Sequence, residues 1–382
     1  MPTRIPRILD NLAESMHTGR VTVIHGPRRV GKTNLVEHYL ESVEGRILRA
    51  VGDDIIVRNL LSSQDRAKIL SWATGYDVVF LDEAQRIPEV GWALKMLIDA
   101  RPELRIIATG SASFQLAGTL GEPLTGRQTP LRLYPISVGE LAASMNAYEL
   151  RVGLPDMLVY GMYPQVRTAQ TDTEKRGVLR ELVSSYLLKD VLELERVKSA
   201  RVLTDLLTLI ALQLGSLVSL RELGQQVGLD VKTVARYLDL LEKAFVLVNL
   251  RGFSRNLRSE VTRNSKWYFY DVGIRNALID NYSPVDSRVD AGALWENFIV
   301  MERMKALEYA GAPSTLRFWR SWSQQEIDLI EDRGGLLHAY EIKWNPRGKA
   351  RLPKEFAEAY PGATYDVVTP ESFLEFVTGA TL

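Results

Sequence analysis

The stretch that decides the fold is Gly26-Pro27-Arg28-Arg29-Val30-Gly31-Lys32-Thr33. A short apolar segment, Val21–His25, precedes it, and residues with helical spacing follow it from Asn34 to Leu40. The glycines let the backbone curl, so that its N–H groups and the start of the helix can surround phosphate oxygens. A chance glycine turn is the alternative, but a phosphate-binding loop requires this strand before it and this helix after it. The sequence therefore predicts a nucleotide site.

Two side chains at the end of this loop have separate expected roles. Lys32 would reach the β- and γ-phosphates of the nucleotide, and the Thr33 hydroxyl would bind Mg²⁺. We therefore expect ATP and Mg²⁺ as cofactors. The predicted ATP-binding residues are Gly26, Pro27, Arg28, Arg29, Val30, Gly31, Lys32, Thr33 and Asn34.

A second apolar segment, from Asp77 to Leu81, ends in two adjacent carboxylates, Asp82 and Glu83. Continuous apolar runs are typical of buried parallel strands, and ligands collect at the carboxyl ends of such strands. We expect Asp82 to hold the Mg²⁺ water shell and Glu83 to polarise the attacking water. A strand that merely ends in solvated acids is the alternative. A catalytic glutamate favours ATP hydrolysis over passive nucleotide storage.

A third strand is predicted over Leu104–Thr109, followed by Gly110-Ser111-Ala112-Ser113. Small hydroxyl side chains at this place could sense the γ-phosphate, with Ser111 or Thr109 in that role. Ordinary turn and helix-capping residues are an equally good explanation.

The middle of the chain, from about residue 138 to 198, is predicted to be helical. One helix is expected over Ser137–Met145 and a longer one over Thr173–Val197, where apolar residues recur at helical spacing. The turn Gly161-Met162-Tyr163-Pro164 separates them. These helices would suit a lid over the nucleotide, and a simple connector is the alternative.

The next segment predicts three short helices and a small β-sheet, which is the pattern of a winged helix. The second helix begins at Ser219, with Glu222 placed for a capping box, and the third is capped by Asp230. The expected helices and strands cover Val202–Leu214, Ser219–Gly228, Asp230–Ala244, Phe245–Leu250, Ser254–Arg258 and Lys266–Tyr270.

Charge on this predicted winged helix favours contact with DNA. The whole chain has 47 basic and 47 acidic residues, so binding must come from a local patch. Asp239 and Glu242 on the third helix would repel phosphate, and docking to a protein is the alternative use of such a unit. The predicted DNA-binding residues are Lys232, Thr233, Arg236, Tyr237, Arg251, Arg255, Arg258, Arg263 and Lys266.

The C-terminal part predicts a helix, three strands, a helix and a strand. Glu296 lies on the first helix, Asp328 on the second strand, and Glu341 and Lys343 on one face of the third. Carboxylates around Mg²⁺ with a lysine beside the attacking water can hydrolyse phosphodiesters. Alternating charges on a half-exposed strand are the alternative. The expected elements are Ala291–Ala310, Thr315–Arg320, Gln325–Glu331, Leu336–Trp344, Leu352–Tyr360 and Tyr365–Val368.

Two resemblances add to these expectations. The segment Gly126–Pro135, a polar turn entering a strand, resembles the AAA-type branch of P-loop ATPases. That resemblance implies that Arg127 reaches a neighbouring subunit's nucleotide site and that the protein forms a homo-oligomer such as a ring; a surface arginine without this role is the alternative. The order helix-Glu296, strand-Asp328, strand-Glu341-x-Lys343 resembles the PD-(D/E)XK nuclease core, with Glu296, Asp328 and Glu341 as implied metal ligands.

Nearly the full length resembles a prokaryotic family of AAA-type ATPases with a winged helix and a nuclease-like C-terminal domain of unknown function. The expected fold class is α/β: an AAA+-like P-loop NTPase core (1–137), a helical lid (138–198), a winged-helix domain (199–284) and a restriction-endonuclease-like domain (285–382). The motifs behind the resemblance are Gly26–Thr33, Leu81–Gln85, Gly110-Ser111, Gly126-Arg127, Tyr163-Pro164, Tyr237–Glu242, Trp295–Asn297, Glu326–Asp328 and Glu341–Lys343.

Composition narrows the function classes. The chain of 382 residues has no cysteine, which excludes disulfides, thiolate zinc sites, iron–sulfur clusters and cysteine catalysis. Its four histidines are scattered. No apolar run approaches the roughly 18 residues of a membrane-spanning helix, so we expect a cytoplasmic protein without a membrane partner.

Two functions remain. In the first, ATP turnover drives an oligomer that binds DNA, and moves or cuts it, with branched DNA such as a four-way junction as the first substrate to try. In the second, the protein is a nucleotide-operated switch, and its winged-helix and vestigial nuclease-like units dock a protein partner. The basic patch and the filled carboxylate–lysine set favour the first function.

Overall fold

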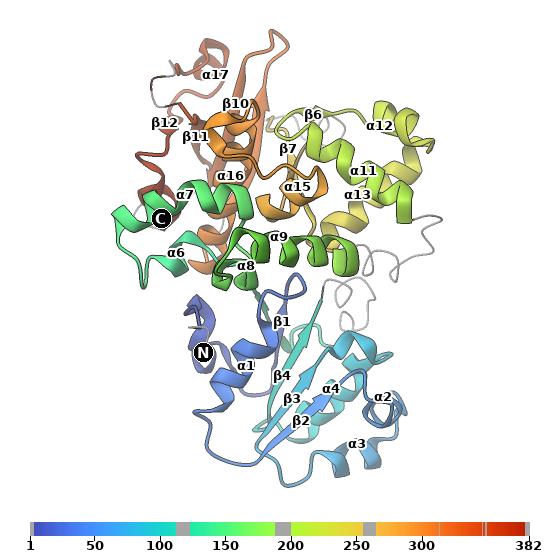
Figure 1. Cartoon of the computed structure of the whole chain (residues 1–382). Coiled ribbons are helices and arrows are strands. Elements are labelled where there is room, and N and C mark those ends of the chain that lie inside the picture. Colours follow the sequence, from blue (N-terminus) through green and yellow to red (C-terminus); the bar gives the residue numbers. More distant parts are fainter. Residues whose placement is uncertain are drawn as a thin grey trace.

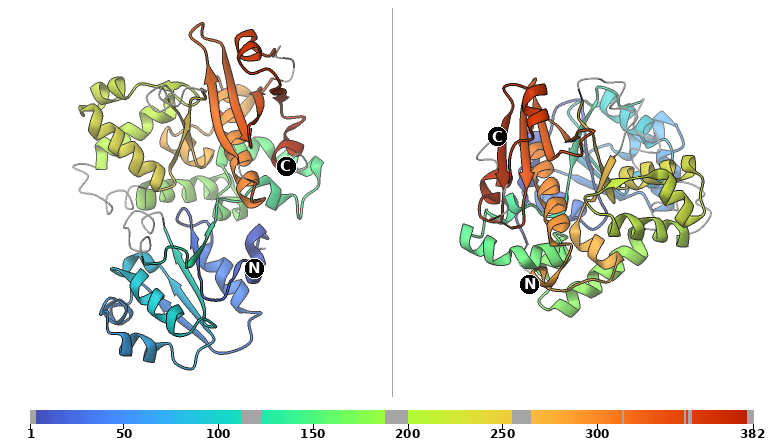
Figure 2. Two further views of the ribbon diagram at one scale, coloured as in Figure 1. Left: turned by 180° about the vertical axis from the view of Figure 1, so that it is seen from behind. Right: turned by 90° about the horizontal axis from the view of Figure 1, so that it is seen from above.

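The computed structural model describes residues 4–111, 123–187, 200–254, 265–312, 314–345, 347 and 350–378. An N-terminal lobe holds one β-sheet, and the rest of the chain forms a second lobe above it in Figure 1. Seen from behind, the green helices that follow the first sheet lie on the side of the second lobe that faces the first lobe (Figure 2, left).

A parallel sheet organises the N-terminal lobe. Its five strands lie in the order β2-β3-β4-β1-β5. The strand before the glycine-rich loop, β1, is therefore separated by β4 from β3, the strand that ends at Asp82. The strands are β1 Val21–His25, β2 Ile47–Val51, β3 Val78–Asp82, β4 Arg105–Gly110 and β5 Gln128–Arg132.

Helices cover both faces of this sheet because side chains alternate along each strand. On one face Ile24 packs in the same core as Leu35 of α1. On the other face Val23 packs in a separate core with Leu94 of α4. The helical elements of this lobe are η1 Ile8–Asp10, η2 Leu12–Ser15, α1 Lys32–Leu40, α2 Ile55–Leu61, α3 Arg66–Trp72, η3 Ala84–Arg86 and α4 Val90–Ala100.

The region after the first sheet is helical, as predicted, but it is divided differently. The predicted helix over Ser137–Met145 is the short α6, and a long helix, α7, was not among those predicted. Gly153 and Pro155 interrupt its sequence pattern, although a proline usually ends a helix. The predicted Thr173–Val197 helix corresponds to α9 and η4, and its part from residue 188 lies outside the described residues. The elements are α6 Val138–Leu141, α7 Ala147–Tyr160, α8 Pro164–Thr168, α9 Asp172–Glu181 and the π-helix η4 Leu182–Leu187.

The three predicted helices after residue 200 are confirmed, with small shifts at their ends. The Ser219 hydroxyl accepts a hydrogen bond from Glu222 N–H, and Asp230 caps the third helix. Gly228 ends α12 with a φ of 70°, a left-handed conformation that glycine adopts readily. A three-stranded sheet of order β6-β8-β7 packs with the helices, with β6 between α11 and α12 in the chain. The predicted strand over Ser254–Arg258 lies almost entirely outside the described residues. The elements are α11 Ala200–Leu212, β6 Leu217–Val218, α12 Leu220–Val227, α13 Val231–Lys243, β7 Leu247–Arg251 and β8 Ser265–Phe269.

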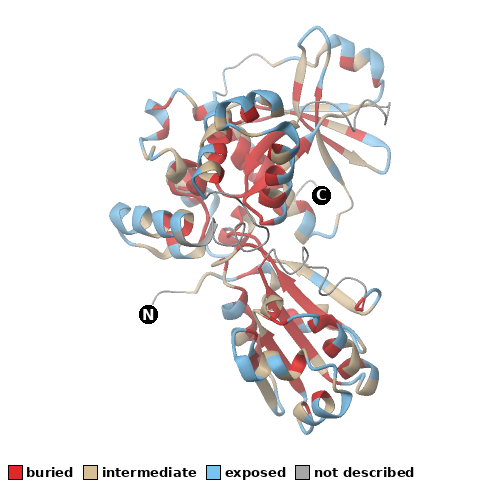
Figure 3. Cartoon of the chain, turned by 90° about the vertical axis from the view of Figure 1, so that its right-hand side faces the viewer, coloured by how far each residue is buried: buried red, intermediate tan, exposed pale blue. Residues whose placement is uncertain are grey.

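Helix α15, which was not predicted, precedes residue 285, and the C-terminal elements then follow the predicted order with η5 and α18 added. Their sheet has the order β12-β11-β10-β9, and β11 pairs with β12 in parallel. Buried residues run along the strands of the first sheet and through the centre of the second lobe (Figure 3). The elements are α15 Val272–Leu278, η5 Val285–Ser287, α16 Ala291–Tyr309, β9 Thr315–Arg320, β10 Glu326–Arg333, β11 Leu336–Ile342, α17 Lys354–Ala359, β12 Thr364–Val368 and α18 Phe373–Thr378.

Within the described parts of the chain, no helix is both long enough and apolar enough to cross a bilayer.

Candidate nucleotide site and carboxylate cluster

The glycine-rich loop has the backbone that its sequence requires. Gly31 has a φ of 96°, and α1 begins directly after it at Lys32. A Cβ atom at Gly26 would lie 2.1 Å from the carbonyl oxygen of Leu133, so no larger residue fits there without a shift of the backbone. The loop is therefore held against the chain that follows β5, with the helix N-terminus at its end.

Lys32 is almost fully buried and folds back over the loop. Its Nζ donates hydrogen bonds to the carbonyl oxygens of Gly26 and Pro27, at 2.9 and 2.8 Å. The ammonium thus lies over the loop, where a bound nucleotide would place its phosphate groups.

Asp82 lies where the ends of β3 and β4 meet the start of α1. Its Oδ2 accepts a hydrogen bond from Thr33 Oγ1 at 2.9 Å, and its Oδ1 accepts one from the Thr109 hydroxyl. Hydroxyl and carboxylate oxygens are the ligands that Mg²⁺ prefers, so Thr33 and Asp82 fit a magnesium ion beside the phosphates. Of the two predicted sensor residues, Thr109 contacts Asp82, whereas the Ser111 hydroxyl accepts from Gln85 Nε2 at 3.2 Å.

Glu83 lies on the wall of the cavity beside this loop. Its backbone has a φ of 51°, in the left-handed region, and its carboxylate accepts a hydrogen bond from the Gln85 side chain. Gly52 permits the close approach of β2 to this turn, because a Cβ atom there would lie 2.1 Å from Glu83 O. The residue predicted to polarise water thus lines the same cavity as Lys32 and Thr33 of the glycine-rich loop.

The cavity has a volume of about 600 Å³ and is large enough for a nucleotide. Two parts of its wall were not predicted, the N-terminal segment and Ile136; helix α8, which also lines the cavity, belongs to the region predicted as a lid. The short N-terminal segment has no periodic pattern that would link it to the loop. The residues that line the cavity are Arg4, Ile5, Arg7, Arg28, Arg29, Val30, Gly31, Lys32, Thr33, Asn34, Glu83, Ile136, Pro164, Gln165 and Thr168.

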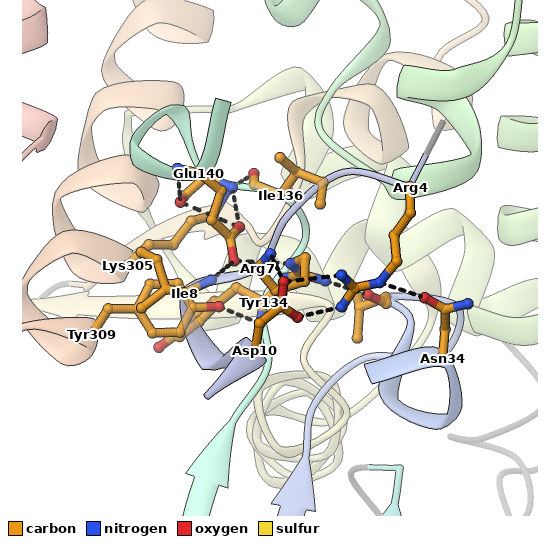
Figure 4. A network of polar contacts seen from close by, with 12 residues as sticks. Arg4, Arg7, Ile8, Asp10, Asn34, Tyr134, Ile136, Glu140, Lys305 and Tyr309 are labelled. Carbon is orange, nitrogen blue, oxygen red and sulfur yellow. Dashed lines mark hydrogen bonds and ion pairs between the residues drawn. The ribbon is translucent and has the colours of Figure 1, made fainter. Parts of the chain in front are cut away.

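Arg7 ties the N-terminal segment to the glycine-rich loop (Figure 4). Its guanidinium donates to Val30 O and Tyr134 O, both at 2.7 Å, and to Glu140 Oε1 at 2.8 Å. Glu140 is buried and also accepts from the backbone N–H of Ser137 at 2.8 Å. One buried arginine therefore joins the loop to the residues that follow β5.

Helix α16 of the second lobe contacts the segment between β5 and α6, which Arg7 also contacts (Figure 4). Lys305 Nζ donates to Ile136 O at 2.9 Å, and the Tyr309 hydroxyl accepts from Tyr134 N–H at 3.1 Å. The backbone N–H of Val138 donates to Glu302 Oε2 at 2.7 Å. The nucleotide loop and α16 are thus connected through the short segment between β5 and α6.

A loop residue also contacts the helices between the lobes. Arg29 donates to Gln165 Oε1 of α8 at 3.1 Å and to Glu181 Oε1 of α9 at 2.6 Å. Helices α8 and α9 therefore contact the glycine-rich loop through Arg29.

Arg127 lies just before β5, at the end of the sheet where the strands begin, whereas the glycine-rich loop lies at the end where they finish. Its carbonyl oxygen accepts from Val21 N–H at 2.9 Å, at the start of β1, and its side chain pairs with Asp99. The glycine-rich loop follows the other end of β1, about 13 Å away along the strand. Arg127 therefore cannot reach its own nucleotide site, and its role in a neighbouring subunit stays a prediction.

Some of the residues predicted to bind DNA are exposed and others are buried. Lys232 and Arg236 on α13 and Arg251 at the end of β7 are exposed. Thr233 is partly used for capping, because its hydroxyl donates to Asp230 Oδ2 at 2.6 Å. The predicted residues Arg255, Arg258 and Arg263 lie outside the described residues.

Two residues predicted to contact DNA are wrongly placed by the sequence analysis. Tyr237 is only 1% exposed and packs in the core of this unit, because it shares a helix face with Val234 and Leu241. Lys266 is also 1% exposed and points into the carboxylate cluster of the C-terminal unit. Neither can contact a phosphate in this conformation.

The carboxylate cluster is formed by α16 and β10. Lys266 Nζ lies 2.9 Å from Glu296 Oε1, 2.5 Å from Glu326 Oε1 and 3.9 Å from Asp328 Oδ1. The Tyr268 hydroxyl donates to Glu296 Oε1 at 2.6 Å. Glu326 belongs to the motif Glu326–Asp328 but was not predicted as a site residue.

Glu341 and Lys343 complete the predicted set on β11 and just after it. Their side chains pair at 2.5 Å, and Asp328 Oδ2 accepts from Ile342 N–H at 2.8 Å. Burial raises the pKa of Glu296 to about 7, although Lys266 opposes this shift. Burial disfavours the charged form of Lys266, but the surrounding carboxylates outweigh it and raise its pKa above the ordinary lysine value.

The cluster does not fit a divalent metal in this conformation. The ammonium of Lys266 already lies among the oxygens of Glu296, Glu326 and Asp328, where a metal would compete with it. Among the described residues, no group of three or more acidic or histidine side chains is arranged to hold a metal ion. The prediction of Glu296, Asp328 and Glu341 as metal ligands is therefore corrected: Lys266 pairs with Glu296 and lies 3.9 Å from Asp328, whereas Glu341 pairs with Lys343. The sequence did not reveal the contact with Lys266.

Three family models match the chain in succession. Residues 18–142 match an AAA domain, residues 151–284 a domain of unknown function (DUF8612), and residues 291–377 a second domain of unknown function (DUF4143).

Two mycobacterial relatives cover most of the chain: Uncharacterized protein Rv2008c of Mycobacterium tuberculosis and Uncharacterized protein Mb2031c of Mycobacterium bovis. Each is 30% identical over 337 residues, which is 87% of this chain and 72% of the relative. A solved structure, the Signal Transduction ATPase with Numerous Domains (STAND) protein with a tetratricopeptide repeat sensor PH0952 from Pyrococcus horikoshii, is 14% identical, and the match covers 81% of this chain and 48% of that one. The TM-score of this match is 0.29. Residues 18–142 thus form an AAA domain, and the chain belongs to the same family as Rv2008c and Mb2031c.

Proposed function

We propose that the protein hydrolyses ATP at the glycine-rich loop and couples this turnover to binding of DNA. The observation that carries the first half is the contact of Asp82 with Thr33 and Thr109, beside a cavity that Glu83 lines. In this proposal residues 1–137 are the ATPase core, 138–198 the lid, 199–284 a winged helix and 285–382 a nuclease-like fold.

The loop residues divide the work of ATP hydrolysis. Lys32 exchanges its two carbonyl partners for phosphate oxygens and stabilises the charge on the transferred group. Thr33 and Asp82 would hold Mg²⁺, which would offset the negative charge of the phosphates. Glu83 accepts a proton from the attacking water at the cavity wall.

The contacts of Arg29 and Arg7 provide a route from the nucleotide to the second lobe. Phosphate groups in the loop would compete with Glu181 for the Arg29 guanidinium, so nucleotide binding would change the contact with α9. Arg7 and the segment between β5 and α6 connect the loop to α16. Turnover would thus alter the position of the second lobe.

The predicted DNA contact rests on the exposed basic residues of the winged-helix unit. Lys232 and Arg236 lie on the exposed side of the helix that would enter the major groove, and Arg251 begins the basic segment of the wing. We propose DNA as the partner, with branched DNA tested before plain duplex, and a homo-oligomer in which Arg127 completes a neighbouring site.

The second candidate is a nucleotide-operated switch that docks a protein. One observation favours it: Asp239 is exposed on α13 beside Lys243, with which it pairs at 2.8 Å, so this part of the face is not purely basic.

Nucleotide binding and ATP turnover of the full chain test the proposal. Lys32→Ala should abolish ATP binding, and tight binding by this variant would contradict the assignment of the loop. Lys68→Glu on α3, an exposed residue away from the cavity, is the control and should bind ATP like the wild type. Fluorescence anisotropy at matched salt then measures the affinity of the protein for single-stranded, duplex and four-way-junction DNA. Tighter binding of one form supports the first function, and equally weak binding of all forms supports the switch.

A further inference from the structure

We infer that Lys266 takes the place of a metal cation in the carboxylate cluster, so that the cluster joins two units of the protein and does not cleave nucleic acid. Lys266 lies on β8, in the sheet that follows α13, whereas its partners lie on α16 and β10. The interaction therefore crosses between the winged-helix and nuclease-like units.

The ammonium has the contacts that a cation at this place would need. It lies 2.9 Å from Glu296 and 2.5 Å from Glu326, with Asp328 at 3.9 Å. The ring of Phe318 adds a cation–π contact, with its centroid 5.7 Å from Nζ. A divalent ion at the same oxygens would lie next to a buried positive charge, which excludes simultaneous occupancy in this conformation.

Neighbouring contacts hold Lys266 in place. The Asn297 side chain donates to Phe269 O and accepts from Phe269 N–H, both at 2.8 Å, so α16 grips the backbone of β8. Trp267 is buried on the same strand, and the Tyr268 hydroxyl donates to Glu296. Strand β8 is also the middle strand of its sheet. These contacts fix the backbone of β8 against α16, and the Lys266 side chain is buried at this junction, so the pairing acts as a joint between the two elements.

With this pairing, both halves of α16 are held by contacts with other parts of the chain. Its first half holds β8 through Glu296 and Asn297, and its second half holds the segment between β5 and α6 through Lys305 and Tyr309. Helix α16 therefore links the predicted DNA-binding unit to the nucleotide lobe. This inference concerns the cluster alone and stands whether or not the protein hydrolyses ATP.

Terbium luminescence tests the inference, because Tb³⁺ occupies oxygen sites and is excited through nearby aromatic rings such as Trp267 and Tyr268. The full-length, nucleotide-free protein is titrated with Tb³⁺ as wild type, Lys266→Ala and Lys266→Ala/Glu296→Gln. Tb³⁺ bound at other sites gives the same emission in all three proteins, so the wild-type curve can be subtracted from those of the variants. We expect Lys266→Ala to gain a site at least ten-fold tighter than any in the wild type, and the double variant to lose it.

A titration that does not rely on folding of the Lys266 variants compares wild type with Glu296→Gln. Because Lys266 blocks the cluster, both should give the same emission curve. Loss of a wild-type Tb³⁺ site in Glu296→Gln would overturn the inference. Mn²⁺-dependent cleavage of a four-way junction by the wild type, abolished in Glu341→Gln, would overturn it as well. Neither result would change the ATP-binding test with Lys32→Ala, so the inference and the proposed function can fail separately.

Discussion

Replacement of Arg7 by alanine is the sharpest test of how the nucleotide loop is held. Arg7 is 9% exposed and donates three hydrogen bonds, to Val30 O, Tyr134 O and Glu140 Oε1, at 2.7, 2.7 and 2.8 Å. The variant would release the loop carbonyl at Val30 and remove the counter-charge of a carboxylate that is only 2% exposed. Both the stability of the N-terminal lobe and its affinity for ATP should fall.

The magnitude follows from the partners that remain. Breaking a buried ion pair by removing one member costs about 3–5 kcal/mol. Glu140 keeps hydrogen bonds from the backbone N–H groups of Ile8 and Ser137, at 3.1 and 2.8 Å, so its carboxylate retains donors. We therefore expect a loss near the lower end, about 3 kcal/mol in the free energy of unfolding.

Urea denaturation followed by circular dichroism measures this loss. ATP shifts the unfolding of the lobe that binds it to higher urea, so the transition that ATP shifts is the one to compare. Arg4→Ala is the matched control from the same segment: its side chain is 28% exposed and its pairing with Asp10 should contribute less than about 1 kcal/mol. The effects of Arg7→Ala and Glu140→Gln should be non-additive by about 1–3 kcal/mol. A loss no larger than that of Arg4→Ala, or strict additivity, would refute this account of the loop.

Three further predictions concern the other sites. Glu83→Gln should leave ATP affinity within about three-fold of wild type and lower turnover by about 100-fold or more; unchanged turnover in a phosphate-release assay would remove Glu83 from the mechanism. Reversal of Lys232 and Arg236 to glutamate should weaken DNA binding at least ten-fold and reduce the salt slope by about 2, whereas Lys68→Glu on α3 should have no effect; equal affinity of both variants would mean that α13 is not the DNA site. Because burial raises the pKa of Glu296 from 4.5 to about 7, its protonated form favours the folded state: its contribution is full below pH 4.5 and is lost as the pH rises through 7, by at most about 1.4 kcal/mol per pH unit. Glu296→Gln should flatten the pH dependence of the melting temperature over this range, and an unaltered profile would contradict that shift.

Much of the nucleotide site could be predicted because its residues are local in sequence. The glycine-rich loop and its lysine and threonine are consecutive, and Asp82 and Glu83 end an apolar strand. Parallel strands bring their ends to one edge of a sheet, which places Asp82 beside Thr33. The sequence pattern contained each of these facts.

Contacts between distant segments could not be predicted in this way. Arg7 and Glu140 are 133 positions apart, and neither position has a periodic signal that identifies the other. Lys266 belongs to an apolar strand near a basic run, and that surrounding charge suggested a phosphate contact. The face of α13 was misjudged at Tyr237, because a tyrosine on an amphipathic helix can face either the core or the solvent. Tertiary packing decided these cases.

The most direct test of the central claim is the steady-state rate of ATP hydrolysis by the full chain with and without a four-way DNA junction, at low and matched salt. We expect the junction to raise the rate at least several-fold in the wild type and to have no effect on the variant with Lys232 and Arg236 reversed to glutamate. A rate that is the same with and without every DNA form, in a protein that still binds ATP, would contradict the coupling and leave the protein-docking switch as the function.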